Sequence, residues 1–361
     1  MQKRTLLAPY ILLICVEVRS YLPLNILILL GVLIFNWLLI YIIPNKGYHT
    51  NAQDMSNTSY ENNTSTTCAN CGKGEEDGIN LKSCNACKMV KYCSRDCQIA
   101  HRPQHKKECK KKAKELHEIE LFKQPPHLEE DCPICFLRMP VLGSGSVYMN
   151  CCGKVICRGC THAVQSSSGP SLCPFCRIQA PDTDDEITEL ERCRVRKGDA
   201  EAINNLGIYY LRGSYGFPQD SAKSFELFLK AADLGFSRAL FNVANSYWFG
   251  RGVEVDTKKA KLYHELAAIR GHASSRNELG VFEVEAGNMI RALKHFMIAA
   301  RGGDINSMKN IKDLYTEGYA TKADFEKALR LYQSYLDEIR STQRDEAAAS
   351  DDENKYYEPA F

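Results

Sequence analysis

The sequence lacks an excess of charge of either sign. Lysine and arginine together number 46 and aspartate and glutamate 44, so the formal net charge of the 361 residues is +2. A chain this balanced has no overall electrostatic attraction to nucleic acid, and we expect no nucleic-acid partner.

Catalytic motifs are also missing from the sequence. It has no phosphate-binding glycine loop, no dinucleotide fingerprint, and not the second histidine that a zinc protease motif would need after His264. We therefore assign no catalytic residue.

The C-terminal half is poor in cysteine, although the whole chain contains 17. Seven lie within residues 68–109 and eight within residues 132–176, which leaves Cys15 and Cys193 outside. Secreted disulfide scaffolds are usually short and bridged throughout, whereas paired CxxC units in a longer chain favour thiolate ligation of metal in a reducing compartment. The pattern predicts two metal-binding parts, named here the first cysteine module (residues 68–109) and the second cysteine module (residues 132–177).

One long stretch without charge follows an N-terminal segment, residues 1–20. Residues 21–43 contain no charged side chain and are long enough to cross the hydrocarbon core of a bilayer, so they predict a transmembrane helix. The alternatives for this stretch are a buried helix or a mispredicted start site. The shorter apolar run from Leu6 to Val16 cannot span a bilayer alone.

The flanking charges and the cysteines predict opposite orientations for this span in the membrane. Lys3, Arg4 and Arg19 precede it and Lys46 stands alone after it, which would keep the N-terminus cytoplasmic and place the cysteines in the lumen. Reduced thiolates require the opposite orientation. From the cysteine chemistry we expect a single-pass membrane protein with both modules facing the cytosol, or a soluble cytoplasmic protein if the N-terminal segment is absent.

Composition suggests how the parts are connected. Residues 44–67 are polar and without period, so they predict a disordered linker. Residues 110–131 predict a helical linker that ends before Pro125 and Pro126, and residues 341–361 an acidic tail. The basic run from Lys106 to Lys114 indicates either a solvated helix face or a membrane-surface contact.

From about residue 199 the sequence repeats with a period in the mid-thirties. Paired alanines recur at 231–232, 267–268 and 299–300, and a Gly-x-Gly turn occurs at Gly250 and Gly252. Such a period predicts helical hairpins stacked as a solenoid over residues 199–340. The pattern resembles the Sel-one-like repeats, relatives of the tetratricopeptide repeat, and the resemblance implies protein partners.

Eight metal ligands are predicted in the first cysteine module. They are Cys68, Cys71, Cys84, Cys87, Cys93, Cys97, His105 and Cys109. A CxxC turn lets two thiolates reach one Zn²⁺ at about 2.3 Å, and a CxxxC or HxxxC pair on a helix places both ligands on one face. Eight ligands are enough for two tetrahedral sites.

The order of these ligands, with the stretches KYCSRDCQ and HKKEC, resembles the MYND finger. The resemblance implies that Cys68, Cys71, Cys93 and Cys97 hold one ion, and Cys84, Cys87, His105 and Cys109 the other. It also implies protein interaction, frequently with proline-containing peptides, rather than catalysis. Where the family usually has tryptophan this chain has Arg102, near Gln98 of the peptide groove. A purely structural zinc knot is the alternative to peptide binding.

The second cysteine module also offers eight ligands. They are Cys132, Cys135, Cys151, Cys152, Cys157, Cys160, Cys173 and Cys176. Their arrangement resembles the RING finger, which implies that Cys132, Cys135, Cys157 and Cys160 hold one ion, and Cys151, Cys152, Cys173 and Cys176 the other. Most RING fingers have a histidine where this chain has Lys154. The adjacent pair Cys151 and Cys152 takes its place here, with His162 as the alternative ligand.

RING fingers that act as ubiquitin ligases orient a conjugating enzyme and its thioester-linked ubiquitin without covalent chemistry of their own. The residues implied by the resemblance are Ile134, Pro174 and Arg177, as contacts of the conjugating enzyme. We therefore predict a membrane-tethered RING-type ubiquitin ligase with four Zn²⁺ ions, whose MYND finger and repeats bind substrates or partners. The alternative is a non-catalytic interaction adaptor. The fold class expected is multidomain: an N-terminal transmembrane helix, two small cross-braced zinc fingers and a C-terminal all-α repeat solenoid.

Overall fold

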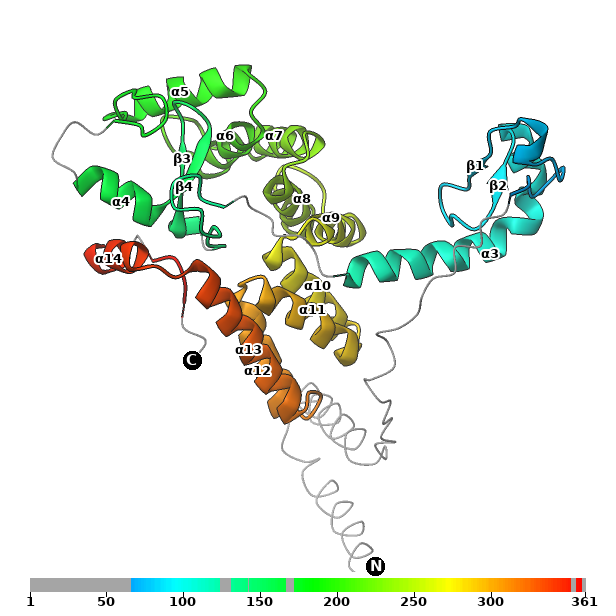
Figure 1. The fold of residues 1–361 in the computed structure, drawn as a ribbon. Coiled ribbons are helices and arrows are strands. Elements are labelled where there is room, and N and C mark those ends of the chain that lie inside the picture. The colour runs from blue at the N-terminus through cyan, green and yellow to red at the C-terminus, as the bar shows by residue number, and fades with distance from the viewer. Residues whose placement is uncertain (1–65, 124–130, 142, 167–171, 352–354, 359–361) are drawn as a thin grey trace, which may run out of the picture. The chain divides into compact units, whose positions relative to one another are not determined.

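The computed structural model describes residues 66–361 apart from 124–130, 142, 167–171, 352–354 and 359–361 (Figure 1). These residues fall within one of two units into which the chain divides, Ser65–Phe361. The predicted N-terminal segment, the span over 21–43 and nearly all of the linker over 44–67 lie outside the described residues.

The first cysteine module contains a short hairpin and the start of a long helix. Strand β1 (Lys82–Ser83) pairs antiparallel with β2 (Lys91–Tyr92). Helix α3 (Arg95–Phe122) then begins at the N-cap Ser94, whose side chain accepts the backbone N–H of Cys97 at 3.2 Å. Of the 28 residues of α3 only Leu121 is buried, so most of this helix is exposed to solvent.

The second cysteine module is built on an antiparallel hairpin and one helix. Strand β3 (Ser146–Met149) pairs with β4 (Lys154–Cys157), with Ser146 opposite Cys157 and Met149 opposite Lys154. Helix α4 (Arg158–Ser166) follows directly. The strand pairing brings the cysteines at the two ends of β4 toward the cysteines of the flanking loops.

From residue 184 onward the described chain is mainly helical, and eight of its helices pack as four hairpins. The helices are α5 (Asp184–Arg196), α6 (Ala200–Arg212), α7 (Ser221–Asp233), α8 (Ser237–Phe249), α9 (Thr257–Ile269), α10 (Ala273–Glu285), α11 (Met289–Arg301), α12 (Ile305–Thr316), α13 (Lys322–Ile339) and α14 (Thr342–Ser350). Hairpins form from α6 with α7, α8 with α9, α10 with α11, and α12 with α13. This is the all-α solenoid expected from the repeats.

Local chemistry explains where the repeat helices begin and end. Asp220 and Asp256 are N-caps whose carboxylates accept backbone N–H groups of the first turn. Gly213 and Gly250 end α6 and α8 in the left-handed conformation, with φ of 67° and 68°. Asp caps therefore fix where α7 and α9 begin, and glycine caps fix where α6 and α8 end.

Small residues let the two helices of a hairpin pack closely. Ala231, Ala267 and Ala299 are completely buried. A Cβ added at Gly207 would lie 2.7 Å from the ring of Phe228, so this glycine is needed for the ring to pack against the backbone of α6. The aromatic residues of the repeats are thus largely core, as their spacing suggests.

The predicted transmembrane helix and the localisation drawn from it need correction. None of the helices that the structure describes is both long enough and apolar enough to cross a bilayer. The longest, α3, fails because lysine and glutamate dominate its exposed surface. The structure therefore supports a chain in which cysteine clusters compatible with zinc are joined to an all-α repeat solenoid. A single-pass membrane protein is not supported, and residues 21–43 lie outside the described residues.

Candidate metal centres and the surfaces around them

Four groups of ligand atoms come together in the two modules. They are Cys68, Cys71, Cys93 and Cys97; Cys84, Cys87, His105 and Cys109; Cys132, Cys135, Cys157 and Cys160; and Cys151, Cys152, Cys173 and Cys176. Within each group the ligand atoms all lie within 4.8 Å of one another. These groups have the membership that the two resemblances imply, and His162 is in none of them.

The distances within the groups fit tetrahedral zinc. Sulfur to sulfur, Cys71 lies 3.6 Å from Cys93 and Cys152 lies 3.7 Å from Cys173. Four thiolates at about 2.3 Å from one Zn²⁺ stand roughly 3.8 Å apart, whereas a disulfide needs about 2.05 Å. Every cysteine within the described residues is a free thiol. The clusters are therefore compatible with zinc, and the alternative of a disulfide scaffold does not fit them.

The same backbone turn recurs at four of the five CxxC pairs, two in each module. The residue after the second cysteine has a positive φ: 74° at Gly72, 57° at Lys88, 58° at Phe136 and 61° at Arg177. Each of these residues donates its N–H to the carbonyl of the first cysteine of its pair, at 2.8–3.0 Å. A left-handed residue here closes the turn so that both thiols point to the same side. Three of these four positions use a residue other than glycine.

Hydrogen bonds within the turns favour thiolates, the form that binds metal. Burial opposes ionisation of Cys68, but backbone N–H groups that include that of Cys71 outweigh it and lower its pKa to about 6. For Cys132 the hydrogen bond from the Cys157 thiol is the largest cause, and its pKa falls to about 4. Each module therefore contains a thiol with a lowered pKa, whereas hydrogen bonds with neighbouring thiols raise the pKa of Cys93 in the first module and of Cys157 in the second.

A second layer of contacts orients the histidine of the first module. The Nε2 atom of His105 lies 3.2 Å from Cys87 Sγ, and its ring stacks on His101 with centroids 5.6 Å apart. The hydroxyl of Tyr92, on β2, lies 3.1 Å from His101 Nδ1. Partners of this kind hold a ligand ring at a fixed angle. The spacing of the ligands did not reveal these contacts, although His101 is visible in the sequence four residues before His105.

The predicted protein contacts are all on the surface. Ile134, Pro174 and Arg177 are exposed, and so are Gln98 and Arg102 of the first module. Beside Ile134, Phe136 keeps 76% of its surface exposed. Beside Pro174, Phe175 is 38% exposed. These side chains therefore lie on the surface of the two modules and not in their cores.

Residues at the N-terminal end of the repeats form hydrogen bonds with the second module. Tyr148 of β3 donates its hydroxyl hydrogen to Asp199 Oδ2 at 3.0 Å, and Arg194 of α5 donates to the same oxygen from Nη2 at 2.5 Å. Burial raises the pKa of Tyr148, so this hydroxyl remains a donor. Gly153, in the turn between β3 and β4, has a φ of 73°, a left-handed conformation that favours glycine.

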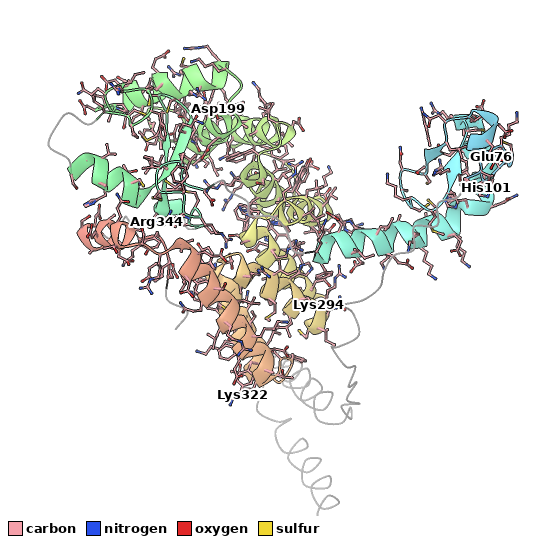
Figure 2. All side chains as sticks on the ribbon, in the orientation of Figure 1. Glu76, His101, Asp199, Lys294, Lys322 and Arg344 are labelled. Carbon is pink, nitrogen blue, oxygen red and sulfur yellow. The ribbon has the colours of Figure 1, made fainter. Side chains whose placement is uncertain are left out.

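Helix α14, which follows the repeats, contacts the same module. The guanidinium of the buried Arg344 donates to the carbonyl of Arg138 at 2.8 Å and lies 3.7 Å from Cys135 Sγ. Its backbone packs so closely on α4 that a Cβ at Gly159 would lie 3.0 Å from the Arg344 Cα. Figure 2 labels Asp199 and Arg344, which come from opposite ends of the repeats.

This packing differs from the acidic tail expected over residues 341–361. Residues 342–350 form α14, and Tyr356 is only 1% exposed. Tyr356 also hydrogen-bonds to Asp345, and a Cβ at Gly145 would lie 2.9 Å from its side chain. The sequence signal for this docking was weak, because one arginine in a charged segment is indistinguishable from a solvated one.

Comparison with known proteins identifies two kinds of part in this chain. The model of the MYND finger matches residues 68–109, and the model of the Sel1 repeat matches residues 200–236, 237–272 and 313–334. The resemblances to MYND and Sel-one-like sequences are thereby confirmed. No match to a RING finger accompanies them.

Individual relatives share one part each. The human protein sel-1 homolog 2 is 28% identical over 149 residues, which is 40% of this chain and 21% of that protein. An ERAD-associated E3 ubiquitin-protein ligase component, HRD3, from Candida glabrata is 25% identical over 151 residues, 41% of this chain and 14% of that protein. The SET domain and MYND-type zinc finger protein 6 of Schizosaccharomyces pombe is 44% identical over 48 residues, 13% of this chain and 9% of that protein.

Among solved structures, a Sel1 repeat protein from Oxalobacter formigenes is 25% identical, with a TM-score of 0.38 over 42% of this chain and 64% of that chain. The chain spans less than a quarter of the length of the curated relatives that it matches. A MYND finger combined with Sel1 repeats indicates a protein that binds other proteins.

Proposed function

We propose that the second cysteine module is a RING finger and that the chain is a ubiquitin ligase. Its ions would be held by Cys132, Cys135, Cys157 and Cys160, and by Cys151, Cys152, Cys173 and Cys176. The proposal rests above all on one observation: Ile134 and Phe136 on one metal-binding loop, and Pro174 and Phe175 on another, are exposed to solvent. A purely structural zinc site has no need of apolar side chains facing water.

In this proposal the exposed surface orients a bound conjugating enzyme and takes part in no covalent step. A ligase of this class holds the conjugating enzyme so that its ubiquitin thioester meets an amine in a reactive pose. Arg177 follows the last cysteine in a left-handed conformation, which fixes where its side chain leaves the loop. Arg344 reaches Cys135 and Gly159, while Ile134 remains 37% exposed. The docked C-terminal helix thus leaves room for a partner at Ile134.

In this proposal the first module and the repeats determine which substrates are ubiquitinated. The first module, residues 68–109, and the repeats over 199–340 would bind substrates or partners, with residues 110–131 joining the two modules. A role near ubiquitin transfer is in keeping with the C. glabrata relative, which is named as a component of a ubiquitin ligase. A chain that used both modules and the repeats only for binding would be an adaptor.

Autoubiquitination of the full chain with a panel of ubiquitin-conjugating enzymes tests the proposal. We expect Ile134→Ala to lower the rate at least tenfold because it removes part of a small apolar contact, and Arg177→Ala to act in the same direction. Zinc content should not change in either variant. Ile99→Ala is the matched control, since Ile99 is an aliphatic residue of the first module that is 58% exposed.

Two outcomes would contradict this assignment. If folded Ile134→Ala protein works at the rate of the unsubstituted chain, the contact is misplaced. If the unsubstituted chain has no activity with any conjugating enzyme, the adaptor function is the correct one.

A further inference from the structure

The last turn of α3 is attached to the repeats, far from the first module where the helix begins. Leu121 packs against Ala268 of α9 and Leu279 of α10 and is only 1% exposed. Along the 27 residues before Phe122 no other side chain of α3 is buried. The helix is therefore anchored on the repeats by its C-terminal end alone.

The groove that receives this end contains a buried cation. Arg276 of α10 is 1% exposed, and its guanidinium donates to the carbonyl oxygens of Leu121 and of Ala268, the latter at 2.8 Å. Both carbonyls belong to the last turns of helices, where the helix dipole is negative and partners within the helix are few. The Ala268 carbonyl also accepts the N–H of Gly271 at 3.1 Å. Burial lowers the pKa of Arg276 to about 10, so it stays charged at neutral pH. Arg276 thus binds the end of α3 and the end of α9 together.

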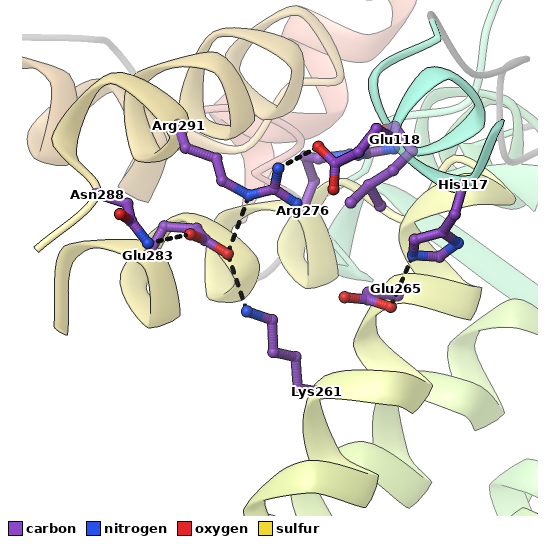
Figure 3. Close-up of polar contacts among 9 residues, drawn as sticks. His117, Glu118, Lys261, Glu265, Arg276, Glu283, Asn288 and Arg291 are labelled. Atoms are coloured by element: carbon purple, nitrogen blue, oxygen red, sulfur yellow. Dashed lines mark hydrogen bonds and ion pairs between the residues drawn. The ribbon is translucent and has the colours of Figure 1, made fainter. Parts of the chain in front are cut away.

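A rim of charged side chains surrounds this contact (Figure 3). Glu118 of α3 forms an ion pair with Arg291 of α11, and Arg291 also bonds to Glu283 through Nε at 3.1 Å. Lys261 of α9 reaches the same oxygen of Glu283 at 2.8 Å. Glu118 therefore joins a network that the repeats hold in place without it.

The final residue of α3 completes the contact. The ring of Phe122 lies 4.6 Å from the ring of His295, and the guanidinium of Arg291 lies 5.0 Å from the Phe122 centroid. His295 Nδ1 and Arg276 Nε are buried and have no hydrogen-bond partner among the described residues. The groove thus retains unused polar capacity while α3 occupies it.

We propose that the groove formed by α9, α10 and α11 is a receptor for the C-terminal end of a helix carrying Glu-x-x-Leu-Phe, and that the chain's own α3 is its resident occupant. Glutamate pairs with Arg291, leucine fills the apolar site and the last carbonyls bind Arg276. The occupant closes a protein-binding groove of the repeats and tethers the first module to it. A helix of the same chemistry on another protein binds only when α3 leaves. This proposal does not depend on ligase activity.

A labelled peptide of residues 110–123 is the probe for this receptor. In fluorescence anisotropy with the full chain we expect no binding to the unsubstituted protein, because α3 fills the groove. Leu121→Asp releases α3, and this variant should bind the peptide at least tenfold more tightly. Adding Arg276→Met, which keeps a chain of similar length without the donors, should remove that gain.

Hydrogen exchange keeps the proposal testable if Leu121→Asp lowers solubility. Glu118→Gln breaks the pair with Arg291 and should speed exchange in the last two turns of α3, with no change in α10. Glu115→Gln is the matched control, since Glu115 lies on the same helix and pairs with Lys112 at 3.3 Å. Peptide binding that is equal in the released and unsubstituted proteins, or unchanged exchange in Glu118→Gln, would overturn the receptor.

Discussion

The two cysteine modules share the geometry of their metal-binding turns but differ in how the rest of the chain holds them. In the first module these turns end at Gly72 and Lys88, and in the second at Phe136 and Arg177, always with a positive φ. Outside the turns the similarity ends. The second module is held from both ends of the repeats, by Asp199 and by Arg344, whereas the contacts described above reach the first module only through the end of α3.

This difference indicates different energetic coupling to the repeats. Tyr148 and Cys135 of the second module contact residues that are themselves part of the repeat fold, so loosening one should loosen the other. The anchor of the first module is the end of α3, where burying Leu121 contributes about 1.5–3 kcal/mol and the Arg276 hydrogen bond and the Glu118–Arg291 ion pair add to it. A contact of that size can open without unfolding either partner.

The largest expected effect comes from removing one zinc ligand in each module. Structural zinc contributes about 10–16 kcal/mol per site at neutral pH, so Cys84→Ser and Cys132→Ser should each unfold the module concerned. Only Cys132→Ser should also speed hydrogen exchange in α5 and α14, because those helices pack on its module. Zinc content by mass spectrometry and peptide-resolved exchange measure both effects. Equal exchange changes in the repeats would mean that the coupling does not differ.

Arg344→Ala should break the C-terminal hold on the second module. The change leaves a cavity and removes the donors of the buried carbonyls of Arg138 and Ile339, which together cost roughly 3–5 kcal/mol. We expect a lower melting temperature and faster zinc loss from this module. Arg340→Ala is the control, because Arg340 is exposed. If both variants have the same melting temperature, the contact of Arg344 with the second module does not contribute to stability.

Glu191 of α5 offers a test by pH. It is completely buried, both carboxylate oxygens lack hydrogen-bond partners among the described residues, and burial raises its pKa to about 7. Because the folded pKa lies above the unfolded value, the folded chain binds this proton more tightly. The stability due to Glu191 is therefore complete below about pH 4.5 and is lost as pH rises to about 7.

Glu191→Gln should remove that loss. In urea titrations its advantage over the unsubstituted chain should grow from roughly 2 kcal/mol at pH 6 to roughly 3 kcal/mol at pH 8. Comparing the two proteins at each pH cancels the pH dependence of zinc binding, which they share. A constant difference across this range would show that Glu191 does not carry the predicted proton.

Tyr148→Phe should give the smallest effect. It removes one hydrogen bond to Asp199, which Arg194 continues to hold, so the cost is about 1 kcal/mol. Tyr319→Phe, at a tyrosine that is 52% exposed, is the control in the same denaturation experiment. If the two variants are equally stable, Arg194 alone secures the N-terminal hold.

The sequence was informative wherever the physics is local. CxxC spacing is a property of four consecutive residues, and it predicted groups of ligands that the structure brings together. Paired alanines and the Gly-x-Gly turn likewise predicted helical hairpins, because close approach of helices and turns between them depend on neighbours in the chain. The inference failed for residues 21–43, where hydrophobicity alone was taken as a membrane span that no described helix supports.

Tertiary structure alone decided which surfaces meet. Arg344 lies 209 residues from Cys135, and Arg276 lies 155 residues from Leu121, and nothing in their neighbouring sequence distinguishes them from solvated arginines. A buried guanidinium is stable only where several carbonyls converge on it, and that convergence exists only after distant helices have packed. The sequence by itself therefore determined the parts of this protein, two cysteine modules and a row of helical hairpins. Packing determined that the repeats enclose one module and hold the other by the end of a single helix.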